Sequence, residues 1–142
     1  MNEIAELREI AHVARRSLEP GLQADSPGSY KSAGACLHAS LLVVMLFTNF
    51  SNCTPTVRGG SDGAGALDTL GNWRGHYWVE IQASSGAMFV VDVTADQFGH
   101  DAVVVLPLDE ASERYRKGPQ AEVDEVFADL LNEYNCRDVV AA

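Results

Sequence analysis

Three residues of the sequence supply a thiol, an imidazole and a carboxylate. Cys36 lies at the start of an apolar run, His76 near the start of a second run, and Asp92 within a third. In acyl-transfer enzymes a thiolate attacks a carbonyl carbon, an imidazole moves the proton, and a carboxylate orients the imidazole. This order of residue types predicts a thiol-dependent acyl-transfer site with Cys36 as its nucleophile.

Cys36 lies near the beginning of an expected helix. The stretch Ala33 to Phe47 is mostly apolar and follows a loop over 19–31 that is rich in Pro, Gly, Ser and Asp. Ser32 is a candidate N-cap for this helix. In a first helical turn, unpaired amides and the positive end of the dipole favour a thiolate and can receive an oxyanion. The position therefore suits a nucleophile, although a free cysteine is more often a small buried hydrophobe.

Two neighbouring strands are expected to carry the histidine and the aspartate. Gly75 to Gln82 alternates in side-chain character as a strand does, and so does the start of Phe89 to Gly99. Residues 84–86 between them form a three-residue hairpin loop that ends in a glycine. We therefore expect an antiparallel pair with His76 on its first strand and Asp92 on its second.

The register of this hairpin decides whether the two side chains meet. If Ala83 pairs with Ala87, Trp78 stands opposite Asp92, and His76 becomes a diagonal neighbour of Asp92 on the same face. Such neighbours lie about 7–8 Å apart at the backbone. A slip by one residue would place them on opposite faces. An aspartate inside an apolar strand needs a partner, which favours the register that gives it one.

The remaining patterns predict an α+β fold in a single domain, 1–142. We expect the Cys-bearing helix at the centre, packed against an antiparallel sheet of at least three strands. Further helices are expected over 2–18, ended by Pro20 and Gly21, and over 121–135; further strands are expected over 55–58 and 102–106. The Gly-rich segment 59–71 is expected to be a mobile surface loop.

Composition limits the partners and the compartment. The chain has 142 residues, 46% of them apolar, and a net charge of -10. This acidity disfavours nucleic acid and anionic membranes, which bind basic patches. The three cysteines are widely spaced, which favours a reducing compartment over a disulfide-bonded module. With no signal peptide or transmembrane segment expected, we predict a cytoplasmic protein, and delivery to another cell by a non-classical route stays open.

The order Cys, His, Asp, with a helix-borne cysteine and a His-Asp strand pair, resembles the papain-like superfamily of cysteine hydrolases. Within it, the chain looks most like the transglutaminase-like branch. The segments that carry the resemblance are Gly34-Ala35-Cys36, Gly75-His76-Tyr77-Trp78-Val79-Glu80 and Val91-Asp92-Val93-Thr94-Ala95-Asp96-Gln97-Phe98. The segment from His76 to Glu80 is also similar to that of leader peptidases in lasso-peptide biosynthesis.

The resemblance implies a papain-like core and acyl-enzyme chemistry. Cys36 would be the nucleophile, His76 the general base and acid, and Asp92 the group that orients His76. Members of the superfamily include peptidases, amidases, deamidases and crosslinking transferases. The resemblance therefore implies a protein or peptide substrate and no cofactor or metal. It indicates the mechanism more closely than it indicates the substrate.

Two residues are candidates for the second oxyanion donor. The papain pattern has a glutamine shortly before the cysteine, and here Tyr30 holds that place with a hydroxyl that can donate. Gln97, in the turn after Asp92, is the other candidate. Thr94 and Asp96 are expected to hold this turn through bonds from their side chains to the backbone.

Two other classes of protein remain as alternatives. One is a zinc site that uses Cys36 or His38 together with His76 and Asp92, although the spacing follows no ligand motif. The other is an acidic interaction module without enzymatic activity. Metal analysis separates the first alternative, and alkylation of Cys36 at mildly acidic pH separates the second.

Overall fold

The computed structural model describes residues 2–25, 35–61 and 63–141, without the side chains of 22–25 and 135–141. Its helices are α1 (Glu3–Asp25), α2 (Cys36–Phe50), α3 (Leu108–Ala111) and α4 (Gln120–Ala141), with a 3-10 helix η1 (Ala95–Phe98). Its strands are β1 (Thr54–Gly60), β2 (Gly65–Leu67), β3 (Trp73–Arg74), β4 (His76–Gln82), β5 (Met88–Asp92), β6 (Val104–Pro107) and β7 (Tyr115–Arg116).

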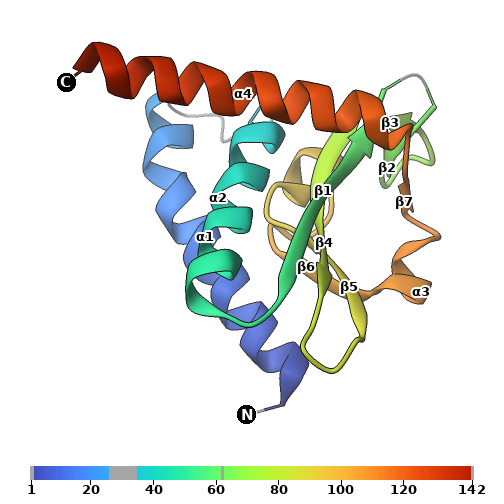
Figure 1. The fold of residues 1–142 in the computed structure, drawn as a ribbon. Helices are drawn as coiled ribbons and strands as arrows, with labels where there is room; N and C mark the ends of the chain where they lie inside the picture. The colour runs from blue at the N-terminus through green and yellow to red at the C-terminus, as the bar shows by residue number, and fades with distance from the viewer. Residues whose placement is uncertain (1, 26–34, 62, 142) are drawn as a thin grey trace.

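The main sheet has four antiparallel strands in the order β1-β4-β5-β6. In the hairpin of β4 and β5, Val79 pairs with Val91, and the amide of Ala83 donates to the carbonyl of Ala87 over 2.9 Å. This is the register that the sequence predicted, so that prediction is confirmed. A smaller sheet, in the order β3-β2-β7, lies beside the main one (Figure 1).

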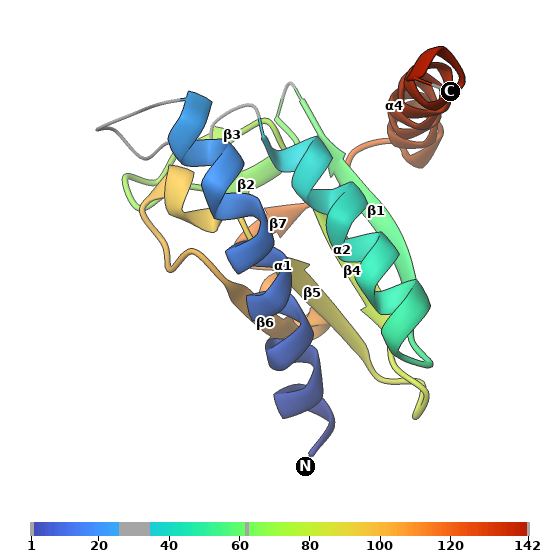
Figure 2. The same cartoon turned by 90° about the vertical axis from the view of Figure 1, so that its left-hand side faces the viewer.

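Helices α1 and α2 lie side by side over one face of the main sheet (Figure 2). Helix α2 packs against β1 and β4 through one face only, because Met45, on its other side, is 51% exposed. The buried residues of this layer are Leu7, Ala11, Ala14, Ala39, Val43, Phe47, Val79, Ile81, Ala83, Phe89, Val91, Val93 and Val105. The α+β class and the packing of the Cys-bearing helix on an antiparallel sheet are confirmed.

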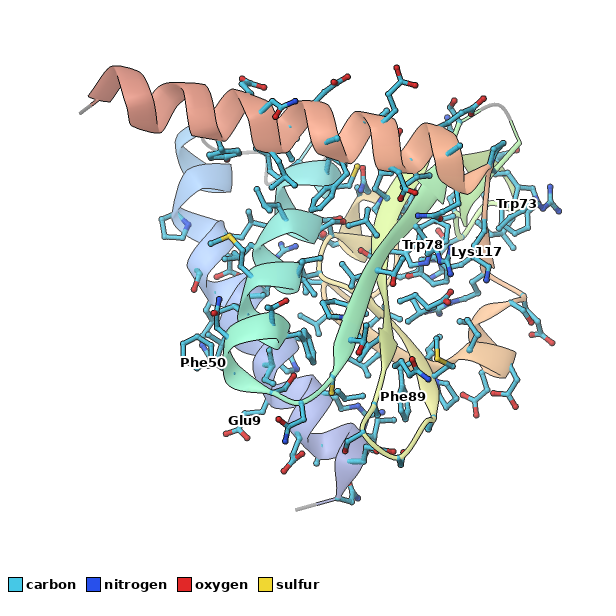
Figure 3. All side chains as sticks on the ribbon, viewed as in Figure 1. Glu9, Phe50, Trp73, Trp78, Phe89 and Lys117 are labelled. Carbon is cyan, nitrogen blue, oxygen red and sulfur yellow. The ribbon has the colours of Figure 1, made fainter. Side chains whose placement is uncertain are left out.

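The opposite face of the main sheet is covered by η1, α3 and β7. Its buried apolar residues are Ala66, Trp78, Val90, Ala95, Phe98, Val104, Ala111 and Tyr115. Trp78 and Lys117 lie on this side, away from α1 and α2 (Figure 3). None of the helices that the structure describes has both the length and the apolar character needed to cross a bilayer.

The first helix is longer than the sequence predicted. The expectation that Pro20 and Gly21 end it was wrong, because α1 continues to Asp25. The fixed φ of proline is compatible with a helix, and Pro20 removes only one backbone hydrogen bond from the ladder. In the same turn, the side chain of Arg15 reaches Glu19 over 3.4 Å, which helps to hold the helix together.

The expected loop over 59–71 contains regular structure. Gly59 and Gly60 end β1, and β2 pairs with both β3 and β7. Gly65 has φ +117°, and a Cβ there would collide with the carbonyl oxygen of Arg74. The close approach of the two strands thus requires a glycine at this position. The Gly-rich composition of segment 59–71 had suggested a loop instead.

Helix α4 packs less tightly than its apolar stripe predicted. It crosses one end of β1 and extends past that strand (Figures 1 and 2). Val123 and Leu130 are buried, but Leu131 is 39% exposed and Tyr134 is 36% exposed. The sequence pattern predicts a buried stripe on this helix, formed by Val123, Val126, Phe127, Leu130, Leu131 and Tyr134. The prediction that all six are buried was wrong.

Candidate active site

Cys36 is the first residue of α2 and is half-buried. Its N-cap position is occupied by Ala35, whose side chain cannot bond to the first-turn amides. The helix therefore begins at the cysteine itself, slightly later than the sequence predicted. The oxyanion candidate Tyr30 and the expected cap Ser32 lie outside the described residues.

His76 is the first residue of β4, and its ring is buried against Asp92. The Nε2 atom of His76 lies 2.8 Å from Oδ2 of Asp92, and both side chains are at most 1% exposed. This contact follows from the register of the hairpin, which places the two residues diagonally on one face. The predicted pair of imidazole and carboxylate is thus brought together.

The thiol of Cys36 lies close enough to the imidazole of His76 to act on its pKa through hydrogen bonding and charge. Because Nε2 faces Asp92, Nδ1 is the nitrogen available to the sulfur, and it is also the nitrogen that Gln97 contacts. Burial lowers the pKa of His76, but the charge and hydrogen bond of Asp92, with a further contribution from Cys36, raise it to about 9. At neutral pH the site therefore favours an imidazolium beside the sulfur.

Asp92 is held as a buried carboxylate by several donors. Its Oδ1 accepts hydrogen bonds from the amide of Thr94 at 3.0 Å and from the Thr94 hydroxyl at 3.3 Å. Its Oδ2 accepts one from the hydroxyl of Tyr115 at 2.8 Å, in addition to that from His76. Burial acts to raise the pKa of Asp92, but the charge of His76 and these hydrogen bonds outweigh it and lower the pKa.

Gln97 contacts the imidazole at Nδ1, the nitrogen that does not face Asp92. The Nε2 atom of Gln97 is 3.1 Å from Nδ1 of His76 and 3.5 Å from the hydroxyl oxygen of Thr94. The carboxamide nitrogen can donate to Nδ1 only while the imidazole is neutral; beside the imidazolium the carboxamide must present its oxygen, because a protonated Nδ1 only donates. Gln97 was predicted as an oxyanion donor, and its carboxamide instead contacts the imidazole in this structure.

The turn that carries Gln97 is fastened to α1. Arg15, which is 4% exposed, donates to both carboxylate oxygens of Asp96 at 3.0 and 2.8 Å and to the carbonyl of Val93 at 2.7 Å. A bidentate guanidinium-carboxylate pair fixes both distance and direction. Helix α1 therefore helps to set the position of η1, and with it Gln97, relative to His76.

Aromatic rings enclose the imidazole. Phe98 meets His76 edge to face at 4.7 Å, and Trp78 stacks on it at 6.1 Å. The ring of Tyr115 lies 5.0 Å from that of Trp78. Burial, together with the charge of Asp92, raises the pKa of Tyr115 well above its usual value, so its hydroxyl stays protonated and donates.

Tyr115 is the site residue that the sequence did not reveal. It lies 23 positions after Asp92, in a charged segment without a clear period, where no strand was expected. The one available signal is an aromatic residue that carries a hydroxyl between charged neighbours, and this is common at protein surfaces. Its role depends on β7 pairing with β2, a contact between distant parts of the chain.

The alternative zinc site is not assembled as expected. His38 is exposed, and its ring meets that of Tyr134 at 6.0 Å. Both oxygens of Asp92 already accept hydrogen bonds. Among the described residues, no group of three His, Cys, Asp or Glu side chains has a geometry suited to a metal ion.

Comparison of the chain with family models, with curated proteins and with solved structures finds no match. A fold class alone does not define an activity, since unrelated functions share the same folds. The function must therefore be argued from the geometry and chemistry of the site.

Proposed function

We propose that this protein is a thiol-dependent acyl-transfer enzyme of the peptidase, amidase or glutamine deamidase type. Cys36 is the nucleophile, His76 is the general base and acid, and Asp92 orients His76. One observation carries the proposal: a buried imidazole is bonded to a buried carboxylate and lies beside a helix-borne thiol that acts on its pKa. Nucleophile, base and orienting group then stand in the order that this chemistry needs.

In the first half of the reaction, the sulfur of Cys36 attacks the carbonyl carbon of an amide. A carbon-sulfur bond forms, and the electron pair of the carbonyl double bond moves to oxygen. Amides at the start of α2 can receive this oxyanion. The tetrahedral intermediate collapses when its carbon-nitrogen bond breaks and the nitrogen takes the proton of His76 Nδ1, which releases the amine and leaves a thioester.

In the second half, a water molecule attacks the thioester. Nδ1 of His76 accepts a proton from the water as its oxygen bonds to the carbonyl carbon. The carbon-sulfur bond then breaks, the acid leaves, and the thiolate and imidazolium are restored. An amine in place of the water would give a transferase, which is why the site defines the reaction class more closely than the product.

A papain-like core of the transglutaminase-like branch is part of the same proposal. A helix that begins at the nucleophile and packs against an antiparallel sheet, with His and Asp on adjacent strands, supports the resemblance to a papain-like core of the transglutaminase-like branch. Protein or peptide substrates follow from that resemblance, and the proposed cytoplasmic location follows from the widely spaced cysteines. The site uses no nucleic acid, membrane or cofactor.

The experiment compares the parent protein with Cys36→Ala, His76→Ala and Cys53→Ala in a screen for amide hydrolysis, glutamine deamidation and amine transfer. The first two should lose activity by a similar factor, roughly 10⁴-fold or more, because nucleophile and base act as a unit. Cys53→Ala is the matched control, since Cys53 is half-buried at the far end of α2. Circular dichroism should show that Cys36→Ala keeps the fold.

Alkylation gives an independent test of the same site. Iodoacetamide at mildly acidic pH should label Cys36 before Cys53, because Cys36 lies beside the imidazole that activates it in the proposed reaction. Mass spectrometry after limited labelling reads the order. If Cys36→Ala retained the parent activity, or if Cys53 were labelled first, Cys36 would not be the nucleophile.

A further inference from the structure

A groove opens beside Gln97. It encloses about 450 Å³ between the turn that joins β2 to β3 and helix η1. Its lining includes Asp68, Thr69, Leu70 and Arg74 from the turn and Gln97 and Phe98 from η1. The two walls are tied together, because the amide of Thr69 donates to the carbonyl of Phe98 over 3.1 Å. The volume lies within the range of about 300–1,000 Å³ that is usual for ligand-binding clefts.

Gln97 connects this groove with the imidazole. In the proposed reaction the departing nitrogen takes its proton from Nδ1 of His76, so it must lie about 2.6–3.2 Å from that atom. Gln97 lies between the imidazole and the groove, because its carboxamide is 3.1 Å from Nδ1 and its side chain also lines the groove. A leaving group that takes its proton from Nδ1 beside Gln97 is therefore directed along Gln97 into the groove.

The groove also offers contacts that suit a peptide. Nε of Arg74 bonds to Asp68 at 3.1 Å, and its two NH₂ groups make no hydrogen bond with the described residues. The side chain of Arg74 is 57% exposed, so these donors are accessible to a backbone carbonyl. Leu70 is 83% exposed and offers an apolar contact in the same groove. A released ammonia molecule would use none of these features.

We propose that the groove between the turn from β2 to β3 and helix η1 binds the leaving-group side of a peptide substrate, with Arg74 as a donor to its backbone. This inference rests on the proposed function, because it needs an acyl-enzyme on Cys36. It narrows the substrate class from amides in general to peptide bonds whose amine side extends over several residues.

The test uses the acyl-enzyme in reverse, where an amine bound in the groove attacks the thioester. p-Nitrophenyl acetate acetylates Cys36, and the burst of p-nitrophenolate that is absent in Cys36→Ala counts the acyl-enzyme. Capture of the acetyl group is then compared for glycinamide and for the tetrapeptide amide Gly-Leu-Gly-Gly-NH₂. Both attack through the α-amino group of glycine, so their ratio reports binding rather than intrinsic nucleophilicity.

The tetrapeptide amide should capture the acetyl group about tenfold more efficiently than glycinamide, and Arg74→Ala should remove most of this preference. Arg116→Ala is the matched control, because Arg116 lies over the ring of Trp73, outside the groove, and the ratio should not change. A burst with equal capture of both amines would overturn the groove while the proposed function stands. A preference that Arg74→Ala leaves intact would also overturn it. Absence of a burst from Cys36 would overturn the proposed function and this inference together.

Discussion

The two faces of the main sheet are built from different chemistry, although they share the same strands. On β4, Val79 and Ile81 point to the layer of α1 and α2, where the buried apolar side chains are aliphatic apart from two phenylalanines. His76, Trp78 and Glu80 point to the opposite face. There Glu80 is 4% exposed and is paired with Arg58 and Lys117, each at 3.3 Å, and the imidazole and carboxylate of the candidate site are buried as well.

The difference between the faces separates stability from function. Burial of aliphatic side chains is favourable and non-directional, at roughly 25 cal/mol per Å² of apolar surface removed from water. Burial of an ionisable group is costly unless every partner is in place, and a hydrophobic replacement is often as stable. The buried charges around His76 and Asp92 therefore invite a functional explanation, whereas the aliphatic core beneath α1 and α2 is explained by stability alone, although α2 also carries Cys36. Four changes test this contrast, from the largest expected effect to the smallest.

Replacing Asp92 should damage the polar face most. In Asp92→Ala the donors of His76, Thr94 and Tyr115 lose a shared acceptor, and removing one member of a buried charged pair costs about 3–5 kcal/mol. Asp92→Asn keeps one acceptor oxygen and should lose less stability and less activity. Urea unfolding and kcat/KM measure the two effects. Equal stability of Asp92→Ala and the parent protein would show that the hydrogen-bond network does not hold this face together.

A change on the aliphatic face should act on stability alone. Ile81 is fully buried on β4, and Ile81→Ala should cost about 2–5 kcal/mol through lost burial and the cavity left behind. Activity per folded molecule should stay at the parent value, because Ile81 points away from the site. Urea titration gives the first quantity, and activity normalised to the folded fraction gives the second. A large fall in normalised activity would mean that the two faces are not independent.

The pH dependence of stability should come from the polar face. The pKa of His76 is raised from 6.5 to about 9, so its contribution is fully present below pH 6.5 and is lost as the pH rises through 9. The pKa of Asp92 is lowered, so its contribution is present above pH 3.8 and is lost as the pH falls through the folded-state value. The alkaline loss amounts to roughly 3 kcal/mol at most.

Urea unfolding between pH 6 and 10 measures this loss. His76→Gln, which does not titrate in this window, is the control and should flatten the alkaline slope. The same slope in His76→Gln and in the parent protein would assign the pH dependence to other groups.

The sequence revealed most of what depends on local pattern. The alternation along 76–82, the glycine of the hairpin loop and the aspartate inside an apolar strand together gave the register, and the register placed His76 beside Asp92. The apolar run after Cys36 gave the helix that carries the thiol. These features were predictable because each rests on a period or a turn within a few residues.

Contacts between distant segments were not predictable in the same way. Pro20 suggested the end of the first helix, but α1 continues to Asp25. Gly65 suggested a loop, but β2, which begins at Gly65, pairs with both β3 and β7. The apolar stripe over 123–134 predicted helix α4 but not how deeply its side chains are buried, because that depends on the contact between α4 and β1. Tyr115 has only an unspecific local signal, because its partner lies on another sheet.

Tyr115 therefore provides the finest test of the polar face. Tyr115→Phe removes one of the donors to Asp92 and leaves the ring packed against Trp78, so stability should fall by about 1–3 kcal/mol. The carboxylate loses a stabilising hydrogen bond, so the pKa of Asp92 should rise toward its usual value. Acid unfolding should then begin at a higher pH than in the parent protein.

Tyr77→Phe supplies the matched control for this test, because Tyr77 is half-buried on β4 and points to the face of the main sheet opposite His76. This substitution also removes a phenol hydroxyl, but one that does not bond to Asp92. The free energy of unfolding at neutral pH and the onset of acid unfolding should therefore both change less than in Tyr115→Phe. Urea and acid titrations of the two variants give both quantities. If both variants lost the same stability, the hydroxyl of Tyr115 would have no special place in the network. The buried carboxylate would then depend on His76 and Thr94 alone.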